Sequence, residues 1–317
     1  MKAARWVLAV VVVLVLVTGL VFYFNPLWVA DQQTRLKLWR EGVKSEYVDA
    51  GGYRLHYFEA GKSGGTPLLL VHGLGARGED WRAMIPAMAA RGFHVYAPDL
   101  PGYGRSSRPA DASYSIAMEE AAVVSFMQAV HLDRADVGGW SMGGWVSMKL
   151  ALDHPELVDR LIVYDSAGVY FPASFGAELF VPGDAPGVTR LMKILSPHPQ
   201  PMPEFVMRAV LRKIARSGWV VERSMSAMTS GKDLLDFRLH DLQQPTLVVW
   251  GAEDELIPLE VGRKIHEGIP NSSLNVVEGC GHLAPLECWE PVAQATESFL
   301  RAQPPIAGTE KSFPAPH

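Results

Sequence analysis

Cysteine is scarce in this chain, and neither sign of charge is in large excess. The 317 residues include two cysteines, Cys280 and Cys288, which lack metal-ligand spacing and are too few for a disulfide framework. We expect two free thiols, with a single disulfide between them as the alternative. Lys and Arg number 29 against 34 Asp and Glu, a formal net charge of −5. This balance argues against a nucleic-acid partner, which would select a strongly basic face.

The sequence also lacks the motifs of phosphate and dinucleotide binding. A glycine-rich turn at residues 72–75 follows an apolar run, but neither G-x-G-x-x-G nor G-x-x-x-x-G-K is present there. Such a turn can instead direct backbone N–H groups at an anion. We expect His72 to brace this turn and Asp99 to organise a loop as a hydrogen-bond acceptor.

One long apolar segment is present at the N-terminus. Trp6 to Phe24 contains no charge and as a helix would span about 28 Å, which matches the hydrocarbon core of a bilayer. Lys2 and Arg5 precede it, and Trp28 follows it as an interfacial aromatic would. The segment predicts a single uncleaved membrane anchor, with a cleaved signal peptide as the alternative. If the short N-terminus stays in the cytoplasm, the rest of the chain faces the outer, periplasmic or extracellular side.

Strand-like and helix-like segments alternate after this anchor. Two β-like stretches at 46–49 and 53–59 are followed by six apolar runs separated by helix-length segments, which predicts a mostly parallel, eight-stranded α/β sheet with helices on both faces. The runs lie at 67–71, 93–97, 135–138, 161–164, 246–250 and 274–277. The predicted units are an anchor (1–26), a juxtamembrane linker (27–45), a core in two parts (46–168 and 242–301), a cap insertion (169–241) and a disordered tail (302–317).

The predicted cap contains a proline-rich segment, a helix and a group of apolar residues. Prolines at every second position from 197 to 203 exclude a helix there, and a helix is expected over 204–216. Its basic stripe, Arg208, Arg212 and Arg216, is interpreted as the wet edge of a packed helix, or alternatively as a membrane contact. Four apolar residues near the start of the cap either line a lipid path or pack in the core: Phe171, Phe175, Leu179 and Phe180.

The pattern Gly139-Trp140-Ser141-Met142-Gly143 directly follows an apolar run. A strand-to-helix turn this tight needs glycines beside the serine, and it projects the serine into a cleft. Ser141 is therefore the candidate nucleophile.

Asp254 and His282 each follow one of the last two apolar runs. Ligand sites of parallel sheets form at the carboxyl ends of strands, so both residues are expected to meet Ser141 there. In this arrangement His282 acts as the base and Asp254 orients it. Asp165 and Glu253 remain as alternative acids.

These segments resemble the α/β-hydrolase fold serine hydrolases of the lipase and esterase type. The resemblance covers residues 46–301 and depends on LLLVHGLG (68–75), APDLPGYGRS (97–106), GWSMGG (139–144), VVWGAEDELIP (248–258) and GCGH (279–282). Within that group the chain is most similar to membrane-anchored monoacylglycerol lipase-like enzymes. The backbone N–H groups of Leu74 and Met142 are expected to form the oxyanion hole.

The leading hypothesis is an anchored serine hydrolase of lipophilic carboxylic esters. Hydrolysis of carbon–carbon bonds in meta-cleavage products, amide or thioester hydrolysis, and a non-catalytic ligand-binding module are the alternatives. No metal or organic cofactor is implied, because the triad and the backbone donors suffice. The oligomeric state is left open.

Overall fold

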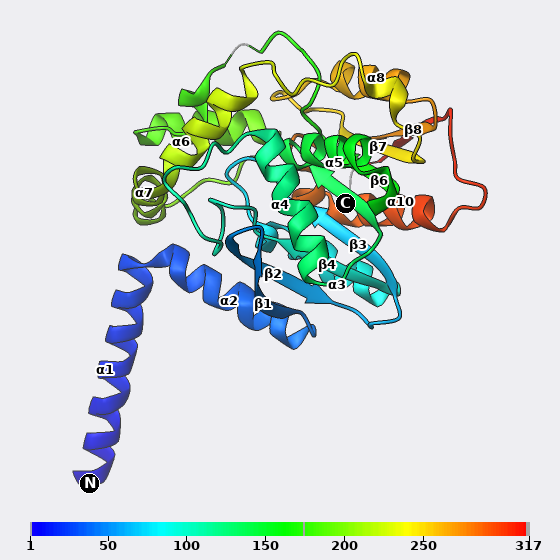
Figure 1. The fold of residues 1–317 in the computed structure, drawn as a ribbon. Coiled ribbons are helices and arrows are strands. Elements are labelled where there is room, and N and C mark those ends of the chain that lie inside the picture. Colours follow the sequence, from blue (N-terminus) through cyan, green and yellow to red (C-terminus); the bar gives the residue numbers. More distant parts are fainter. Residues whose placement is uncertain (1, 174, 315–317) are drawn as a thin grey trace.

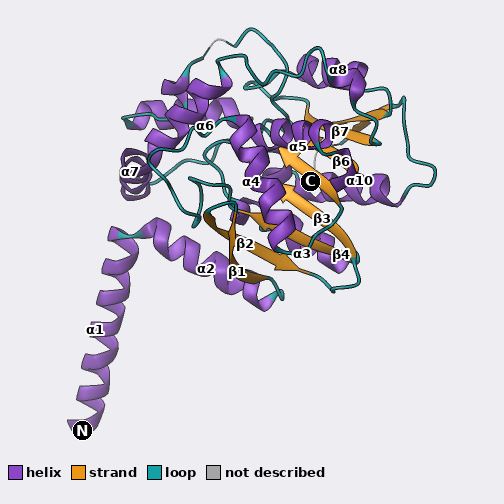
Figure 2. Ribbon diagram, in the orientation of Figure 1, coloured by secondary structure: helices purple, strands orange, loops and turns teal. Residues whose placement is uncertain are grey.

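A computed structural model describes residues 2–173 and 175–314 of the protein. Within these residues the chain forms one twisted sheet with helices on both faces (Figures 1 and 2). The strand order is β1-β2-β4-β3-β5-β6-β7-β8-β9, antiparallel at β1–β2 and β2–β4 and parallel elsewhere. The strands are β1 (Lys44–Ala50), β2 (Tyr53–Ala60), β3 (Thr66–Val71), β4 (Phe93–Pro98), β5 (Ala135–Trp140), β6 (Val158–Tyr164), β7 (Thr246–Gly251), β8 (Ser272–Val277) and β9 (Glu310–Phe313).

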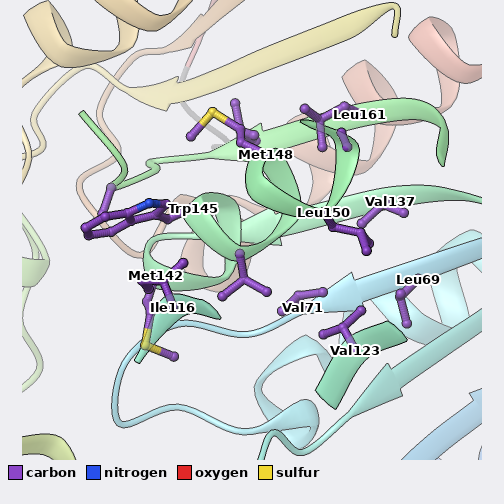
Figure 3. Packing of buried hydrophobic residues seen from close by; sticks show 14 of the residues in the cluster. Leu69, Val71, Ile116, Val123, Val137, Met142, Trp145, Met148, Leu150 and Leu161 are labelled. Atoms are coloured by element: carbon purple, nitrogen blue, oxygen red, sulfur yellow. The ribbon is translucent and has the colours of Figure 1, made fainter. Parts of the chain in front are cut away.

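Successive side chains of the central strands enter two separate cores. Leu69 and Val71 of β3 face the core that α4 and α5 cover, whereas Leu68 and Leu70 face the opposite one. Figure 3 shows the first of these cores, where side chains of α5 pack over β3 and Val137 of β5. The first core is covered by α4 (Ile116–Ala129), α5 (Met142–Asp153) and α8 (Leu259–Gly268), and the second by α3 (Met84–Ala90) and α10 (Trp289–Arg301). Burial on both faces explains why these strands read as continuous apolar runs.

The sheet contains a ninth strand where eight were predicted. Residues 302–317 were predicted to be disordered, but within the described part of that tail Glu310–Phe313 pairs in parallel with Leu274–Val277 of β8. The prediction was wrong because a four-residue edge strand is too short to show a periodic pattern. Its hydrogen bonds are made by the backbone, and the prolines that suggested disorder lie outside it.

Among the described residues between β6 and β7, two α-helices form most of the cap. They are α6 (Ala185–Leu195) and α7 (Glu204–Met228). Helix α7 begins at the predicted residue, directly after Pro203, but extends twelve residues past the expected end at 216. The four apolar residues near the start of the cap pack against the α4–α5 core, and their role as a lipid path stays a prediction.

The N-terminal region consists of two helices, α1 (Lys2–Phe24) and α2 (Pro26–Arg40). Residues Arg5–Phe24 have a mean hydropathy of 3.0 and are unburied, so α1 is long and apolar enough to cross a membrane. Figure 1 shows α1 projecting from the body and α2 turning to run along it beside β1 and β2.

The end of α1 contacts the cap helix α7. Arg208 donates to the Tyr23 hydroxyl at 2.8 Å, and Arg212 donates to the Phe24 carbonyl at 3.1 Å. The Tyr23 and Phe205 rings stack with centroids 5.5 Å apart. Two arginines of the predicted basic stripe therefore meet the end of the apolar helix.

Candidate active site

Ser141 occupies a sharp turn between β5 and α5. Its backbone has φ 56° and ψ −120°, a strained conformation for a residue with a side chain, and its N–H donates to the Tyr164 carbonyl at 2.9 Å. A side chain at Gly139 would place its Cβ 2.2 Å from the Gly143 carbonyl oxygen, and one at Gly143 would lie 2.3 Å from the Val71 oxygen. The two glycines are therefore a steric requirement of this turn.

Ser141, His282 and Asp254 form one chain of hydrogen bonds. Ser141 Oγ lies 3.0 Å from His282 Nε2, and His282 Nδ1 lies 2.8 Å from Asp254 Oδ2. The other carboxylate oxygen of Asp254 accepts the N–H groups of Leu256 and Ile257, each at 2.9 Å. These two bonds hold the carboxylate in place, and the chain can move a proton from the serine to the imidazole.

The alternative acids lie elsewhere. Asp165 is fully buried at the end of β6, and its Oδ1 accepts the Gly251 N–H at 2.7 Å. Burial, and then the charge of Asp254, raise the pKa of Asp165 well above its ordinary value, which favours a neutral carboxyl. Glu253 donates its N–H to the Cys280 carbonyl at 2.9 Å, and its carboxylate makes no hydrogen bond to described residues. The structure thus brings Asp254 to His282.

Leu74 and Met142 flank the serine from two directions. Met142 is the first residue of α5, whereas Leu74 lies in the loop after β3, next to Gly73, whose added Cβ would be 3.0 Å from Ser141 Cβ. Among the described residues, neither the Leu74 nor the Met142 N–H donates a hydrogen bond to protein. Both donors are therefore free for an anion beside the serine.

His72 and Asp99 support this loop, as the sequence predicted. His72 Nδ1 donates to the Gly73 carbonyl at 2.8 Å, and its Nε2 accepts the Leu100 N–H at 3.0 Å. Burial lowers the pKa of His72, which agrees with a neutral ring. Asp99 accepts the Gly78 N–H at 2.7 Å and a bond from His56 at 2.8 Å. Both residues act as loop supports, and among the described residues neither forms a hydrogen bond with Ser141, His282 or Asp254.

The model of the alpha/beta hydrolase fold family matches residues 66–287. The chain belongs to this family. It is 33% identical over 264 residues to the 2-hydroxymuconate semialdehyde hydrolase of Pseudomonas putida, covering 79% of this chain and 92% of that protein. It is 30% identical over 270 residues to Lipase 1 of Psychrobacter immobilis, covering 80% and 84%. The solved structure of a membrane phospholipase A, at 27% identity, superposes with a TM-score of 0.80 over 95% of this chain and 98% of that one.

The two cysteines of this hydrolase form a disulfide, so the expectation of two free thiols was wrong. Cys280 and Cys288 are separated by eight residues, and their Cα atoms lie 6.4 Å apart. The short helix α9 (Ala284–Glu287) turns the chain back and brings the two together. The bond closes the loop that carries His282, a connection that residue spacing alone did not reveal.

Sequence reasoning also missed how His282 is held from its other side. The Trp140 indole N–H donates to the His282 carbonyl at 2.8 Å, and the two rings lie 5.8 Å apart. Trp140 occupies one of the two variable positions of the serine pattern, so the pattern itself contains no information about this contact. A tryptophan directly before the serine was the only available indication.

Proposed function

We propose that this protein is a serine hydrolase that cleaves lipophilic carboxylic esters through an acyl-enzyme. The observation that carries the proposal is the hydrogen-bond chain from Ser141 through His282 to Asp254, at 3.0 and 2.8 Å. A nucleophile bonded to a base that is itself oriented by an acid is the arrangement that acyl transfer requires.

The reaction proceeds in two steps. Ser141 Oγ attacks the ester carbonyl carbon while His282 Nε2 takes the hydroxyl proton, and that proton then passes to the departing alcohol. Water next attacks the acyl-serine, giving its proton to His282, and the carboxylic acid leaves as Ser141 regains a proton. Asp254 stabilises the imidazolium in both steps, and the N–H groups of Leu74 and Met142 stabilise the oxyanion.

Membrane lipids are the proposed source of the ester. The membrane phospholipase A structure aligns with 95% of this chain, so the alignment must include part of α1 or α2. The sequence alignment with 2-hydroxymuconate semialdehyde hydrolase covers 79% of this chain. Helix α1 supports a single-pass anchor. The Cys280–Cys288 disulfide favours an oxidising compartment, in agreement with a catalytic domain on the outer side of the membrane.

Carbon–carbon bond hydrolysis is the second candidate. The observation that favours it is the 33% identity to 2-hydroxymuconate semialdehyde hydrolase, which is higher than the 30% identity to Lipase 1. A serine, a histidine and an oxyanion hole suit a ketone carbonyl as well as an ester carbonyl. The triad alone therefore does not distinguish these substrates.

A substrate panel separates the two candidates. Full-length protein in detergent is offered p-nitrophenyl esters of increasing chain length, a monoacylglycerol, a phospholipid and a ring-cleavage dienoate. We expect ester turnover that increases with acyl chain length, and Ser141→Ala should lower kcat by a factor of at least 10³. Ser230→Ala, at an exposed serine of the cap, is the matched control. Rapid dienoate loss without ester turnover would overturn the ester proposal, and full activity of Ser141→Ala would overturn the serine mechanism.

A further inference from the structure

Helix α2 has an inward face that the proposed mechanism does not use. Asp31, Arg35 and Leu38 recur at helical spacing and are at least partly buried, whereas Trp39 is exposed. Leu38 packs in the same core as Phe58. The helix is therefore fixed to the body, and Figure 1 shows it continuing from α1.

Asp31 forms a two-pronged ion pair with Arg77. Arg77 Nη2 lies 2.7 Å from Asp31 Oδ1, and Nη1 lies 3.3 Å from Oδ2. Arg77 also pairs with the buried Glu79 at 3.0 Å. Burial opposes the charge, but the bond to Asp31 and the Glu79 charge outweigh it and raise the pKa of Arg77. A paired, partly buried guanidinium has a defined position, because its fork geometry allows few arrangements.

Arg77 ends the loop that carries the Leu74 N–H. The loop begins at Gly73 and has one internal backbone bond among described residues, from the Ala76 N–H to the Gly73 carbonyl at 3.2 Å. Its middle residue, Gly75, is exposed and has φ +71°. The Arg77 N–H donates to Asp80 at 2.9 Å. The position of Leu74 thus depends on how firmly the two ends of this short loop are held.

We propose that the juxtamembrane helix holds the oxyanion loop in place through the Asp31–Arg77 pair, with Asp31 as a positioning residue. The proposal rests on the proposed function, because it assigns a task to the Leu74 N–H. Asp31 does not touch substrate or the triad. It fixes Arg77, and Arg77 fixes the loop three residues beyond the donor. The juxtamembrane helix α2 and a donor of the oxyanion hole are thereby connected through one ion pair.

The test compares variants of Asp31 in the full-length protein. Asp31→Ala and Asp31→Asn remove the carboxylate, and Asp31→Glu keeps it on a longer side chain. Gln33→Ala, at an exposed residue of the same helix, is the control. The measurements are kcat, KM, the inhibition constant of a trifluoromethyl ketone whose oxyanion occupies the hole, and the thermal midpoint.

We expect Asp31→Ala to lower kcat tenfold to a hundredfold, because loss of a whole oxyanion donor costs about 10²–10³ and the donor here is displaced, not deleted. The inhibition constant should rise by the same factor while KM changes less than twofold. Asp31→Glu, which keeps a carboxylate opposite Arg77 and leaves the Arg77–Glu79 pair intact, should recover most of the loss. The Gln33→Ala control should resemble the wild type.

Three results would overturn the proposal: an unchanged kcat in Asp31→Ala, a fall in kcat with an unchanged inhibition constant, or no recovery in Asp31→Glu. If Asp31→Ala does not fold, Asp31→Asn keeps the shape of the side chain and is judged by the same criteria. Failure of the proposed function is recognised separately, because Ser141→Ala would then remain active whatever the Asp31 variants do.

Discussion

Replacement of Asp254 by Asn tests which acid completes the triad. The two side chains have the same shape, so the Leu256 and Ile257 N–H groups can still donate to the amide oxygen. The amide nitrogen then faces His282 Nδ1, where a carboxylate oxygen now lies at 2.8 Å. Because an amide NH₂ donates, the ring must accept at Nδ1 and carry its proton at Nε2. That tautomer cannot take the Ser141 proton.

The expected loss follows from this reversal of roles. A triad aspartate replaced by asparagine costs about 10⁴ in kcat in a serine protease, where the wrong tautomer is the cause. The same factor here corresponds to about 5.4 kcal/mol of transition-state stabilisation. Asp165→Asn should keep kcat within about fivefold, because an amide oxygen can accept the one hydrogen bond that its carboxyl makes to described residues, from the Gly251 N–H.

The assay combines turnover of the best substrate with the rate of labelling by a fluorophosphonate, which reports nucleophile activation directly. Thermal unfolding of each variant controls for folding. The reasoning is refuted if Asp254→Asn keeps more than a tenth of wild-type kcat, or if Asp165→Asn is the variant that loses activity.

Three further predictions concern stability. Replacement of Cys280 and Cys288 by serine should lower the free energy of unfolding by about 2–3 kcal/mol, the loop-closure value for so short a loop, and a reductant should reproduce the shift in the thermal midpoint. Burial raises the pKa of Asp136 from 3.8 to about 7, so the stability that its neutral carboxyl contributes is lost as pH rises through about 7. In urea unfolding at pH 4 to 8, the free energy of unfolding should fall by up to about 4 kcal/mol over this range, and Asp136→Asn should flatten this dependence. Gly139→Ala should destabilise by about 2 kcal/mol or more, since its Cβ would meet backbone oxygen at 2.2 Å, whereas Gly64→Ala meets nothing within 4 Å and serves as control; equal midpoints would contradict the steric argument.

The sheet was predictable because its central strands are buried on both faces. Burial on both sides demands apolar residues at every position, and runs such as 246–250 show this directly. The triad partners could be assigned because each follows such a run, and the ends of parallel strands share one edge. Chain order then restricted the acid to a few carboxylates, of which the structure brings Asp254 to the histidine.

Long-range contacts made by single side chains could not be predicted. The Asp31–Arg77 pair joins residues 46 positions apart, and no periodic pattern reports one ion pair. Strand β9 is specified by backbone bonds to β8, which any short polar segment can make. The disulfide depended on the turn of α9, whose four residues are too few for a helical pattern. In each case the determining information lies in three-dimensional proximity.

The burial of Ser141 and the position of α7 together bear on how a substrate reaches the serine. Ser141 is 9% exposed and His282 2%, so the protein covers both side chains almost completely. Helix α7 contacts the end of α1 through Arg208 and, near its other end, places Ser224 Oγ 2.7 Å from the Tyr103 hydroxyl. Tyr103 in turn lies beside Met142, the residue after the nucleophile. The 25 residues of this helix span about 37 Å, so a single helix connects the end of α1 with Tyr103 beside Met142. We therefore predict that the proposed ester substrate approaches Ser141 from the α1 end of this helix, in which case turnover should favour long acyl chains over short soluble esters.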